Sequence, residues 1–272
     1  MIENGWLGGP VAITGANGQV GRALQKRLAD LGNEVRPLGR GDDLREAFRR
    51  ADAIVHLAGG LVVRKPDSYE SANLSTVRAT VDALGGSGVR RVVFLSFITA
   101  DPTSDNPYLR AKGQAERLLA ERGLPVVVFR TDHIYGPPDD PGPMAAAFVS
   151  KEGKAVRMLG SGAQRLAPIY KGDVVQAIVS AALDPSTPTG TFELAGPVTM
   201  TTDGFVQALN RNQAALTHTA PWLSRTLSHV LPTLTPPMVD VLLSDAVPRG
   251  DPRETAARFG FELHGIDVTW GG

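Results

Sequence analysis

Tyr108 and Lys112 are the residues of this 272-residue chain whose types and spacing best suit proton-transfer chemistry. They stand four residues apart, so a helix over this segment places the phenol and the ammonium on one face. A phenol ordinarily titrates near pH ~10, and a neighbouring positive charge lowers that pKa by favouring the phenolate. The pair is therefore suited to exchanging a proton with a hydroxyl or carbonyl oxygen. The alternative is an exposed Tyr and Lys on a surface helix.

Three more polar residues stand where they could support Tyr108. Ser96 ends an apolar, strand-like run, and Thr99 lies between that run and Tyr108. Either hydroxyl could hydrogen-bond the substrate oxygen, and we favour Ser96 because of its place at the strand terminus. The alternative, which is equally expected for each residue, is an ordinary strand-end or turn hydroxyl with no role at the substrate. Asn73 lies in an otherwise apolar helical stretch, where it is mildly unfavourable; we expect it to bind backbone or a water and to support the proton relay.

A glycine-rich run near the N-terminus predicts a nucleotide site. The strand-like run at 10–13 leads into Thr14-Gly15-Ala16-Asn17-Gly18-Gln19-Val20-Gly21 and then into an amphipathic helix. Gly15 can make the tight turn, Gly18 lets the backbone approach a pyrophosphate, and Gly21 lets helix and strand pack closely. The free N–H groups at the helix start favour phosphate. This strand–turn–helix context is the one that a dinucleotide-binding fingerprint needs.

The end of the second expected strand bears on the choice between NAD and NADP. An acidic side chain there hydrogen-bonds the ribose 2′-hydroxyl and favours NAD, but the run at 34–38 continues into Gly39 and Arg40. Arg40 can make a bidentate contact with a 2′-phosphate, so we expect NADP(H) to be favoured over NAD(H). The alternatives are that Asp42 or Asp43 turns in and selects NAD, or that Arg40 is a solvated turn residue.

Apolar runs alternate with helical patterns through the first half of the chain. Strands are expected at 10–13, 34–38, 53–57, 91–96 and 125–130, and helices at 20–31, 44–50, 68–86 and 108–122. Continuous apolar strands separated by helices predict a parallel sheet covered on both faces, and right-handed crossovers make it doubly wound. The short interval before the third strand predicts that one edge strand is missing or reduced.

Two domains are expected in this α/β chain. Residues 1–184 should form a doubly wound parallel Rossmann sheet that binds NAD(P). Residues 185–272, with parts of 136–170, should form a small C-terminal substrate-binding lobe, since loops and proline-rich short helices replace the regular alternation there.

Composition excludes several classes of function. The 28 basic and 28 acidic residues balance and form no basic stripe, so a nucleic-acid partner is not expected. The lack of cysteine excludes disulfides and thiol chemistry, and the spacing of the five histidines predicts no metal site. No apolar run is long enough for a membrane span, and no signal peptide is evident. We therefore expect a cytoplasmic protein.

Together these residues resemble the short-chain dehydrogenase/reductase superfamily, in its extended and atypical branches. The resemblance rests on the run at 14–21, on the segments 57–59, 130–136 and 169–174, and on Asn73, Ser96, Tyr108 and Lys112. Within the superfamily, the sequence is similar in particular to the complex I nucleotide-binding accessory subunits and to NAD-dependent epimerase/dehydratases. The resemblance implies an NAD(P)-binding Rossmann fold. The residues it implies at the cofactor, beside Arg40, are Thr14, Gly15, Asn17, Gly18, Gln19, Val20, Gly21, Leu57, Ala58, Gly59, Lys112, Thr131 and His133.

The resemblance also implies an activity. We expect an NAD(P)-dependent oxidoreductase or epimerase/dehydratase that acts on a hydroxyl or carbonyl carbon of an unidentified small molecule. Tyr108 would be its acid/base, and Lys112 would bind the ribose. Arg165 lies where sugar-nucleotide enzymes of the superfamily often carry a phosphate-binding arginine. The alternative is a non-catalytic NAD(P)H-binding scaffold or redox sensor. Analogy with related folds adds a homodimer through the helices at 68–86 and 108–122.

Overall fold

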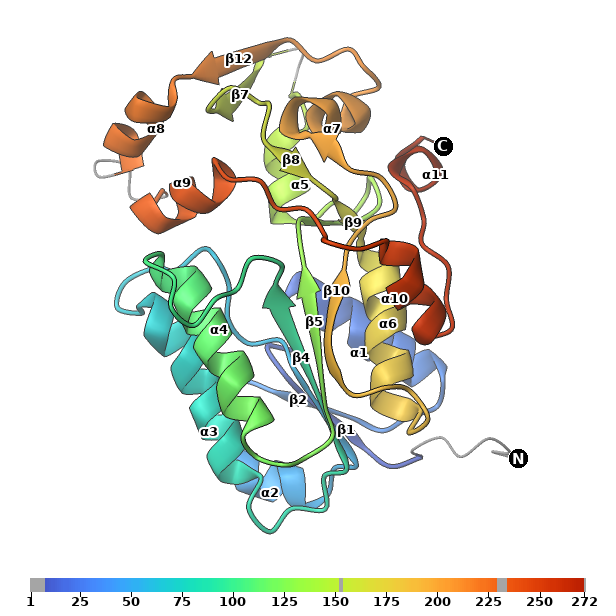
Figure 1. The fold of residues 1–272 in the computed structure, drawn as a ribbon. Helices are drawn as coiled ribbons and strands as arrows, with labels where there is room; N and C mark the ends of the chain where they lie inside the picture. Colours follow the sequence, from blue (N-terminus) through green and yellow to red (C-terminus); the bar gives the residue numbers. More distant parts are fainter. Residues whose placement is uncertain (1–7, 152–153, 229–233, 272) are drawn as a thin grey trace.

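The central element of the fold is a parallel sheet. The computed structural model describes residues 8–151, 154–228 and 234–271. Six strands form the sheet in the spatial order β10–β5–β4–β3–β1–β2 (Figure 1). The α/β class is confirmed, and β2 lies at the edge of the sheet, where the missing strand would have paired. The strands are β1 (Val11–Thr14), β2 (Val35–Leu38), β3 (Ala53–His56), β4 (Arg91–Phe97), β5 (Val126–Thr131) and β10 (Gly190–Leu194).

Helices cover both faces of this sheet, as a doubly wound fold requires (Figure 1). One face packs against α1 (Gln19–Asp30) and α6 (Lys171–Leu183). The other face packs against α2 (Leu44–Arg49), the π-helical segment η1 (Ser71–Ser75), α3 (Thr76–Ala83) and α4 (Pro107–Ala120). The inner strands β1, β3, β4 and β5 are buried on both sides because each face carries its own apolar helices.

A smaller lobe lies beyond the carboxyl ends of the strands (Figure 1). Its described residues form three two-stranded sheets, which pair β6 with β9, β8 with β11, and β7 with β12. These strands are β6 (Ile134–Tyr135), β7 (Val156–Leu159), β8 (Arg165–Leu166), β9 (Ile169–Tyr170), β11 (Met200–Thr201) and β12 (Leu216–Thr219). Its helices are α5 (Pro143–Phe148), α7 (Thr202–Leu209), α8 (Pro221–Ser228), α9 (Pro236–Leu242) and α11 (Ile266–Trp270).

The chain crosses between the two parts more often than a single boundary after residue 184 implies. Strand β10 pairs in parallel with β5 and completes the large sheet. Helix α10 (Pro252–Arg258) packs beside β10, and Phe259 is buried in the core between the sheet and α6. These returns follow from packing, since the outer edge of β5 needs a neighbouring strand and that end of the sheet needs an apolar cover.

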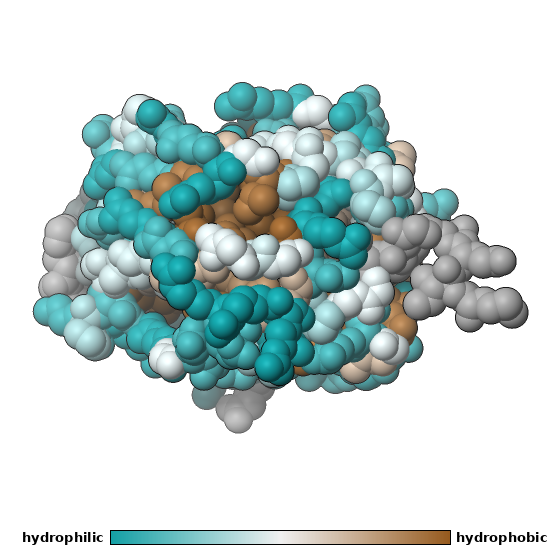
Figure 2. Space-filling model, turned by 90° about the horizontal axis from the view of Figure 1, so that it is seen from below, coloured by the Kyte–Doolittle hydropathy of each residue, from teal (hydrophilic) through white to brown (hydrophobic). Residues whose placement is uncertain are grey.

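The end of the molecule opposite the lobe has hydrophilic residues around a central apolar area (Figure 2). Large exposed apolar side chains of the described residues are otherwise scattered and include Val62, Trp222 and Val268. Within the described ranges, no helix has both the length and the apolar character needed to cross a membrane.

Candidate active site

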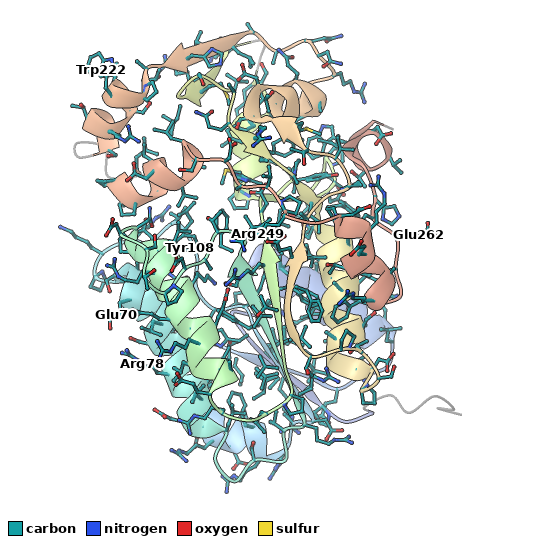
Figure 3. The ribbon with its side chains drawn as sticks, viewed as in Figure 1. Glu70, Arg78, Tyr108, Trp222, Arg249 and Glu262 are labelled. Atoms are coloured by element: carbon teal, nitrogen blue, oxygen red, sulfur yellow. The ribbon has the colours of Figure 1, made fainter. Side chains whose placement is uncertain are left out.

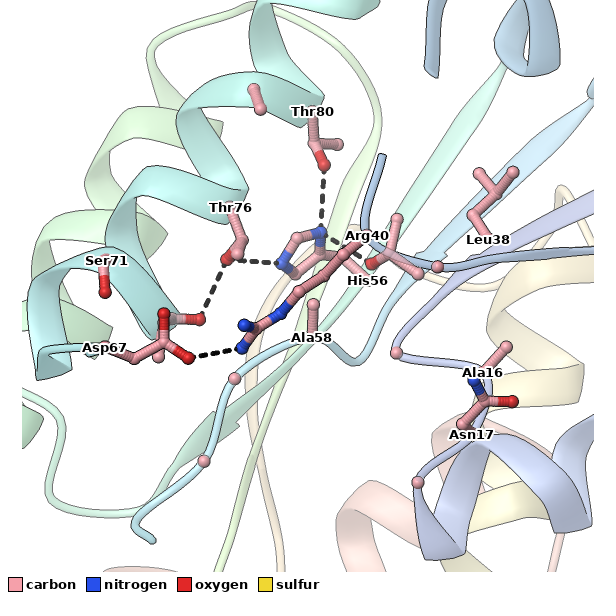
Figure 4. A pocket seen from close by; sticks show the side chains of 18 of the residues that line it. Ala16, Asn17, Leu38, Arg40, His56, Ala58, Asp67, Ser71, Thr76 and Thr80 are labelled. Carbon is pink, nitrogen blue, oxygen red and sulfur yellow. Dashed lines mark hydrogen bonds and ion pairs between the residues drawn. The ribbon is translucent and has the colours of Figure 1, made fainter. Parts of the chain in front are cut away.

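A cavity of about 900 Å³ opens beside the carboxyl ends of β1, β2 and β3 (Figure 4). Four of the expected cofactor residues in the first turn line it: Thr14, Gly15, Asn17 and Gly18. The segment after β2, which includes Arg40, and the segment after β3, which includes Ala58 and Gly59, line it as well. The fold therefore brings three separate loops of the sequence to one site, as expected at the carboxyl edge of an open parallel sheet.

The glycines of the first turn act largely as the fingerprint predicts. Gly15 has a φ of 71°, and a Cβ there would lie 2.6 Å from the backbone nitrogen of Ala58. A Cβ at Gly21 would lie 2.6 Å from the Ala16 carbonyl oxygen. Gly18 caps α1 with extended backbone and without a side-chain hydrogen bond, so the first N–H groups of α1 are open to an anion. The cavity and these N–H groups fit a dinucleotide.

Several expected cofactor residues do not line this cavity. Gln19 opens α1, while Val20 and Gly21 are buried where that helix packs on the sheet. Leu57 donates a backbone hydrogen bond of 3.0 Å to the Thr14 carbonyl oxygen. These residues pack behind the first turn and hold it in place. Spacing along the sequence does not distinguish this packing role from contact with a ligand.

Arg40 and the acidic residues near it have different local partners. The Asp43 carboxylate accepts a hydrogen bond from the Glu46 backbone and caps α2, and Asp42 accepts one from the Gly39 backbone at 2.7 Å. Arg40 instead reaches across the cavity, where its Nη2 lies 2.6 Å from Oδ2 of Asp67 (Figure 4). Neither acidic alternative binds Arg40, and both carboxylates have backbone partners.

His56 forms part of the cavity wall and was not singled out from the sequence. Its Nδ1 lies 2.9 Å from the Thr14 hydroxyl and 3.0 Å from the Thr80 hydroxyl (Figure 4). Burial, with a further contribution from the charge of Lys112, lowers the pKa of His56 to about 3. The imidazole is therefore neutral at physiological pH. The sequence feature that could have identified His56 is its position as a polar residue at the end of an apolar strand.

Asn73 holds the loop that follows β3. Its side chain is fully buried and accepts a hydrogen bond from the Gly60 nitrogen at 2.9 Å. Its Nδ2 donates to the carbonyl oxygens of Gly60 and Tyr69, at 3.2 and 3.1 Å. The expected backbone contact is present, and it shapes the cavity wall because Gly59 and Gly60 line that wall.

The start of α4 positions Tyr108 and Lys112. Asn106 caps the helix by accepting hydrogen bonds from the Tyr108 and Leu109 nitrogens, so Tyr108 falls in the first turn and Lys112 in the second. The Lys112 ammonium donates to the Leu95 carbonyl oxygen at 3.0 Å. Burial lowers the pKa of Lys112 to about 8, against the opposing charge of Glu116.

Tyr108 lies where α4 meets the lobe (Figure 3). Its ring centroid is 6.0 Å from that of Tyr69 and 5.6 Å from that of Phe97. Burial raises the pKa of Tyr108, and Tyr69 adds to the rise. In this structure, which holds no nicotinamide, burial sets the direction of the shift, and Lys112 does not lower this pKa. Among the described residues, no side chain or backbone group hydrogen-bonds its hydroxyl.

The structure does not bring Ser96 to Tyr108, contrary to the expectation that Ser96 faces the substrate. The buried Ser96 hydroxyl donates to Glu116 Oε1 at 2.5 Å. Successive strand residues point to opposite sides, and Phe97 is the neighbour that meets the Tyr108 ring. Thr99 lies in the turn after β4 and is exposed.

Thr131 and His133 join the sheet to the lobe and do not line the described cavity. The Thr131 hydroxyl donates to the Ser96 carbonyl oxygen at 3.4 Å. His133 Nδ1 lies 2.5 Å from Asp132, whose other oxygen accepts a hydrogen bond from the Ala167 backbone. Burial acts to lower the pKa of His133, but the charge and the hydrogen bond of Asp132 outweigh it and raise that pKa.

Comparison with known families identifies this arrangement. Residues 11–195 match the model of the NAD dependent epimerase/dehydratase family. The chain belongs to this family. The match spans the whole large sheet, including β10, and thus all the strands that frame the cavity. Membership agrees with the resemblance drawn from the residues and shows an NAD-binding Rossmann protein of an oxidoreductase class.

Curated relatives of this epimerase/dehydratase family member differ in their descriptions. It is 35% identical over 134 residues to a UDP-2-acetamido-2,6-beta-L-arabino-hexul-4-ose reductase of Pseudomonas aeruginosa, covering 46% of this chain and 36% of the relative. It is 26% identical over 219 residues to the mitochondrial NADH dehydrogenase [ubiquinone] 1 alpha subcomplex subunit 9 of Arabidopsis thaliana, covering 70% and 54%. A ceramide reductase of Caulobacter vibrioides is 28% identical over 153 residues, covering 48% of each chain. The chain thus spans about half or less of these relatives.

Solved structures share the fold across nearly the whole chain. MoeE5 in complex with UDP-glucose and NAD superposes with a TM-score of 0.75 at 19% identity, covering 96% of both chains. The NAD dependent NDP-hexosamine 5,6-dehydratase TunA gives 0.72 at 17% identity, covering 96% of this chain and 95% of that one. At these identities the likeness establishes the fold, and the reaction must be argued from this chain's own residues.

Proposed function

We propose that this protein binds NADP(H) and acts on a hydroxyl or carbonyl carbon of a small molecule, as an oxidoreductase or an epimerase/dehydratase. The observation that carries the cofactor part is the composition of the cavity. The first turn supplies free N–H groups for phosphate, β2 ends in Leu38 without an acidic side chain, and Arg40 and Arg64 line the same cavity. The carboxylates of Asp42 and Asp67 line the cavity as well, and the two guanidinium groups are the partners that we assign to a 2′-phosphate.

Tyr108 and Lys112 support the catalytic part of the proposal. A bound nicotinamide would supply or accept a hydride. Because burial raises the pKa of Tyr108, its phenol keeps its proton at neutral pH and can donate it to a substrate oxygen. The Lys112 ammonium, on α4, donates to the Leu95 carbonyl oxygen near the end of β4, and its charge acts on His56 in the cavity wall. Lys112 itself does not line the cavity, so its proposed contact with the cofactor ribose requires the ammonium to leave Leu95.

The surroundings of Tyr108 favour a substrate with an apolar body. Phe97, Ile98, Ala167, Ala195, Val241 and Ala246 share one buried cluster with Tyr69 and Tyr108. Arg165 lies on the exposed edge of the lobe, where its Nε pairs with Asp245 at 3.0 Å. We therefore propose an apolar carbonyl compound rather than a nucleotide sugar as the substrate, since the side chains around Tyr108 are apolar and Arg165 is already paired.

A non-catalytic NADP(H)-binding scaffold is the second candidate, and specific observations favour it. The hydroxyl of Ser96 is bonded to Glu116 and is not available to a substrate. Tyr108 is enclosed by apolar side chains. A scaffold needs the cofactor for stability and needs no proton donor. Both candidate functions therefore require cofactor binding, and only the enzyme turns over a substrate.

Direct titration of NADPH and NADH against wild type and Arg40→Ala, at low phosphate, tests the proposal. We expect wild type to bind NADPH more tightly than NADH. Arg40→Ala should weaken NADPH about tenfold and leave NADH nearly unchanged, since charge-assisted hydrogen bonds contribute about 1.5–3 kcal/mol. Equal affinity for both dinucleotides, unaffected by Arg40→Ala, would contradict the choice of NADP(H).

Tyr108→Phe then separates the two candidates. An enzyme should lose at least ~100-fold in turnover while its NADPH affinity stays the same. For the scaffold, Tyr108→Phe should change neither NADPH affinity nor the cofactor-dependent rise in thermal stability. A substrate screen with NADPH oxidation as the readout supplies the activity against which the variant is compared.

A further inference from the structure

The ion pair between Arg40 and Asp67 bridges two loops of the cofactor cavity. Arg40 extends from the loop after β2, and Asp67 lies on the segment between β3 and η1. The Arg40 side chain is 85% exposed and that of Asp67 is 28% exposed, with 2.6 Å between Nη2 and Oδ2. Both residues line the cavity, and their side chains meet there (Figure 4).

This arrangement gives Arg40 a competing partner. The guanidinium donors that would bind a 2′-phosphate are partly engaged by a carboxylate. An incoming phosphate must displace that carboxylate or share Arg40 with it, and it meets the negative charge of Asp67 at short range. A ligand with a free 2′-hydroxyl carries no such charge and meets no such repulsion.

We infer that Asp67 sets the selectivity of this protein for the 2′-phosphate, by holding Arg40 and by opposing a second anion beside it. The inference rests on the proposed function, because it presupposes that an adenine dinucleotide occupies this cavity. Asp67 is a specificity-determining residue in this scheme: it reduces the preference for 2′-phosphorylated ligands below the level that Arg40 alone would give.

Arg64 supplies a second positive charge at the same cavity. It is exposed and follows the loop that Asn73 holds in place. No hydrogen bond or ion pair of the described residues engages its side chain. Arg64 is therefore a second guanidinium available to a 2′-phosphate in this cavity.

Binding of two small probes, 2′,5′-ADP and 5′-AMP, tests the inference without any catalytic readout. Isothermal titration would compare wild type with Asp67→Asn at low ionic strength and without phosphate buffer. We expect Asp67→Asn to bind 2′,5′-ADP about two- to fivefold more tightly, because one exposed charge pair changes affinity by about this factor. Its affinity for 5′-AMP should not change. Unchanged or weaker binding of 2′,5′-ADP would overturn the inference.

Glu70→Gln is the matched control. It removes the same charge three residues further along the chain, where Glu70 pairs with Arg78 and not with Arg40 (Figure 3). We expect its affinity for both probes to equal that of wild type. A gain for 2′,5′-ADP as large as that of Asp67→Asn would reduce the effect to net charge and overturn a specific role for Asp67.

A double-mutant cycle tests the route through Arg40. In the Arg40→Ala background the gain from Asp67→Asn should shrink, because no guanidinium remains to be released. An equal gain in both backgrounds would overturn the role of the ion pair. Failure of wild type to bind either probe would instead count against the proposed cofactor site itself, so the two failures are distinguishable.

Discussion

The Ser96 hydroxyl donates a hydrogen bond of 2.5 Å to the Glu116 carboxylate, and the same carboxylate binds the Arg130 guanidinium. Ser96 and Glu116 are both buried. The three side chains join β4, α4 and β5 below the start of α4, where Tyr108 and Lys112 lie. A carboxylate in this position needs both donors, because burying it with fewer partners would cost free energy.

Ser96→Ala should therefore affect stability more than turnover. The variant leaves Glu116 without one donor, and we expect the free energy of unfolding to fall by about 1–3 kcal/mol in denaturant titrations. Once a substrate is known, kcat/KM should stay within a few-fold of wild type, rather than fall by the ~100-fold expected when a donor to the reacting oxygen is lost. A large loss of kcat/KM at unchanged stability would restore Ser96 as a substrate contact.

His56 should make the folded state sensitive to acid. Burial lowers the pKa of His56 to about 3, below its ordinary value of 6.5. Between these values the unfolded chain binds a proton that the folded chain does not, so this residue lowers the free energy of unfolding as the pH falls from 6.5 towards 3. For one titrating group, the free energy of unfolding changes by at most about 1.4 kcal/mol per pH unit in this range.

His56→Gln should flatten that slope, because an amide can still hydrogen-bond Thr14 or Thr80 without titrating. Denaturant unfolding from pH 7 to pH 4 checks the expectation. At pH 7 and above, this residue contributes no pH dependence in either protein. Parallel curves for wild type and variant through the acid range would show that His56 does not stay neutral in the folded state.

Asn73→Ala should weaken both the fold and the cofactor site. The variant deprives the Gly60 nitrogen and the Gly60 and Tyr69 carbonyl oxygens of their partner. We expect the free energy of unfolding to fall by about 2–3 kcal/mol, since buried backbone groups left unpaired are costly. NADPH affinity should also fall, because Gly60 lines the cavity. NADPH binding equal to that of wild type would mean that the loop keeps its shape without Asn73.

Catalytic efficiency should rise with the apolar length of the substrate. In a homologous series of alkyl ketones assayed with NADPH, each added methylene should raise kcat/KM up to about fourfold until the site is filled, since burying one contributes about 0.8 kcal/mol. UDP-glucose serves as the polar comparison and should not compete with the ketones. Competition by UDP-glucose, together with no dependence on chain length, would point to a nucleotide-sugar site.

Val241→Ala provides a structural control for that series. Val241 belongs to α9 and is buried in the cluster around Tyr108. Removing two of its carbon atoms should reduce the gain per methylene while leaving NADPH affinity unchanged, because Val241 does not line the cofactor cavity. The gain per methylene, rather than the absolute rate, is the quantity to compare.

Local patterns were sufficient for much of the fold. The turn at Gly15 and the packing at Gly21 depend on residues a few positions apart, so a strand–glycine–helix pattern predicts them. The parallel sheet follows in the same way from alternating apolar runs. The return of β10 and α10 to the large sheet was not predicted, because the need for a strand beside β5 is a property of the assembled sheet.

The sequence by itself determined the dinucleotide fingerprint, the placement of Tyr108 and Lys112 in successive turns of one helix, and Arg40 at the end of β2. Each of these depends on short-range spacing. The tertiary structure alone decided that Ser96 binds Glu116, that Asp67 pairs with Arg40, and that burial raises the pKa of Tyr108. A side chain's hydrogen bonds depend on partners that are distant in the sequence, and its pKa depends also on the exclusion of water. Both conditions arise only when the helices and strands pack together.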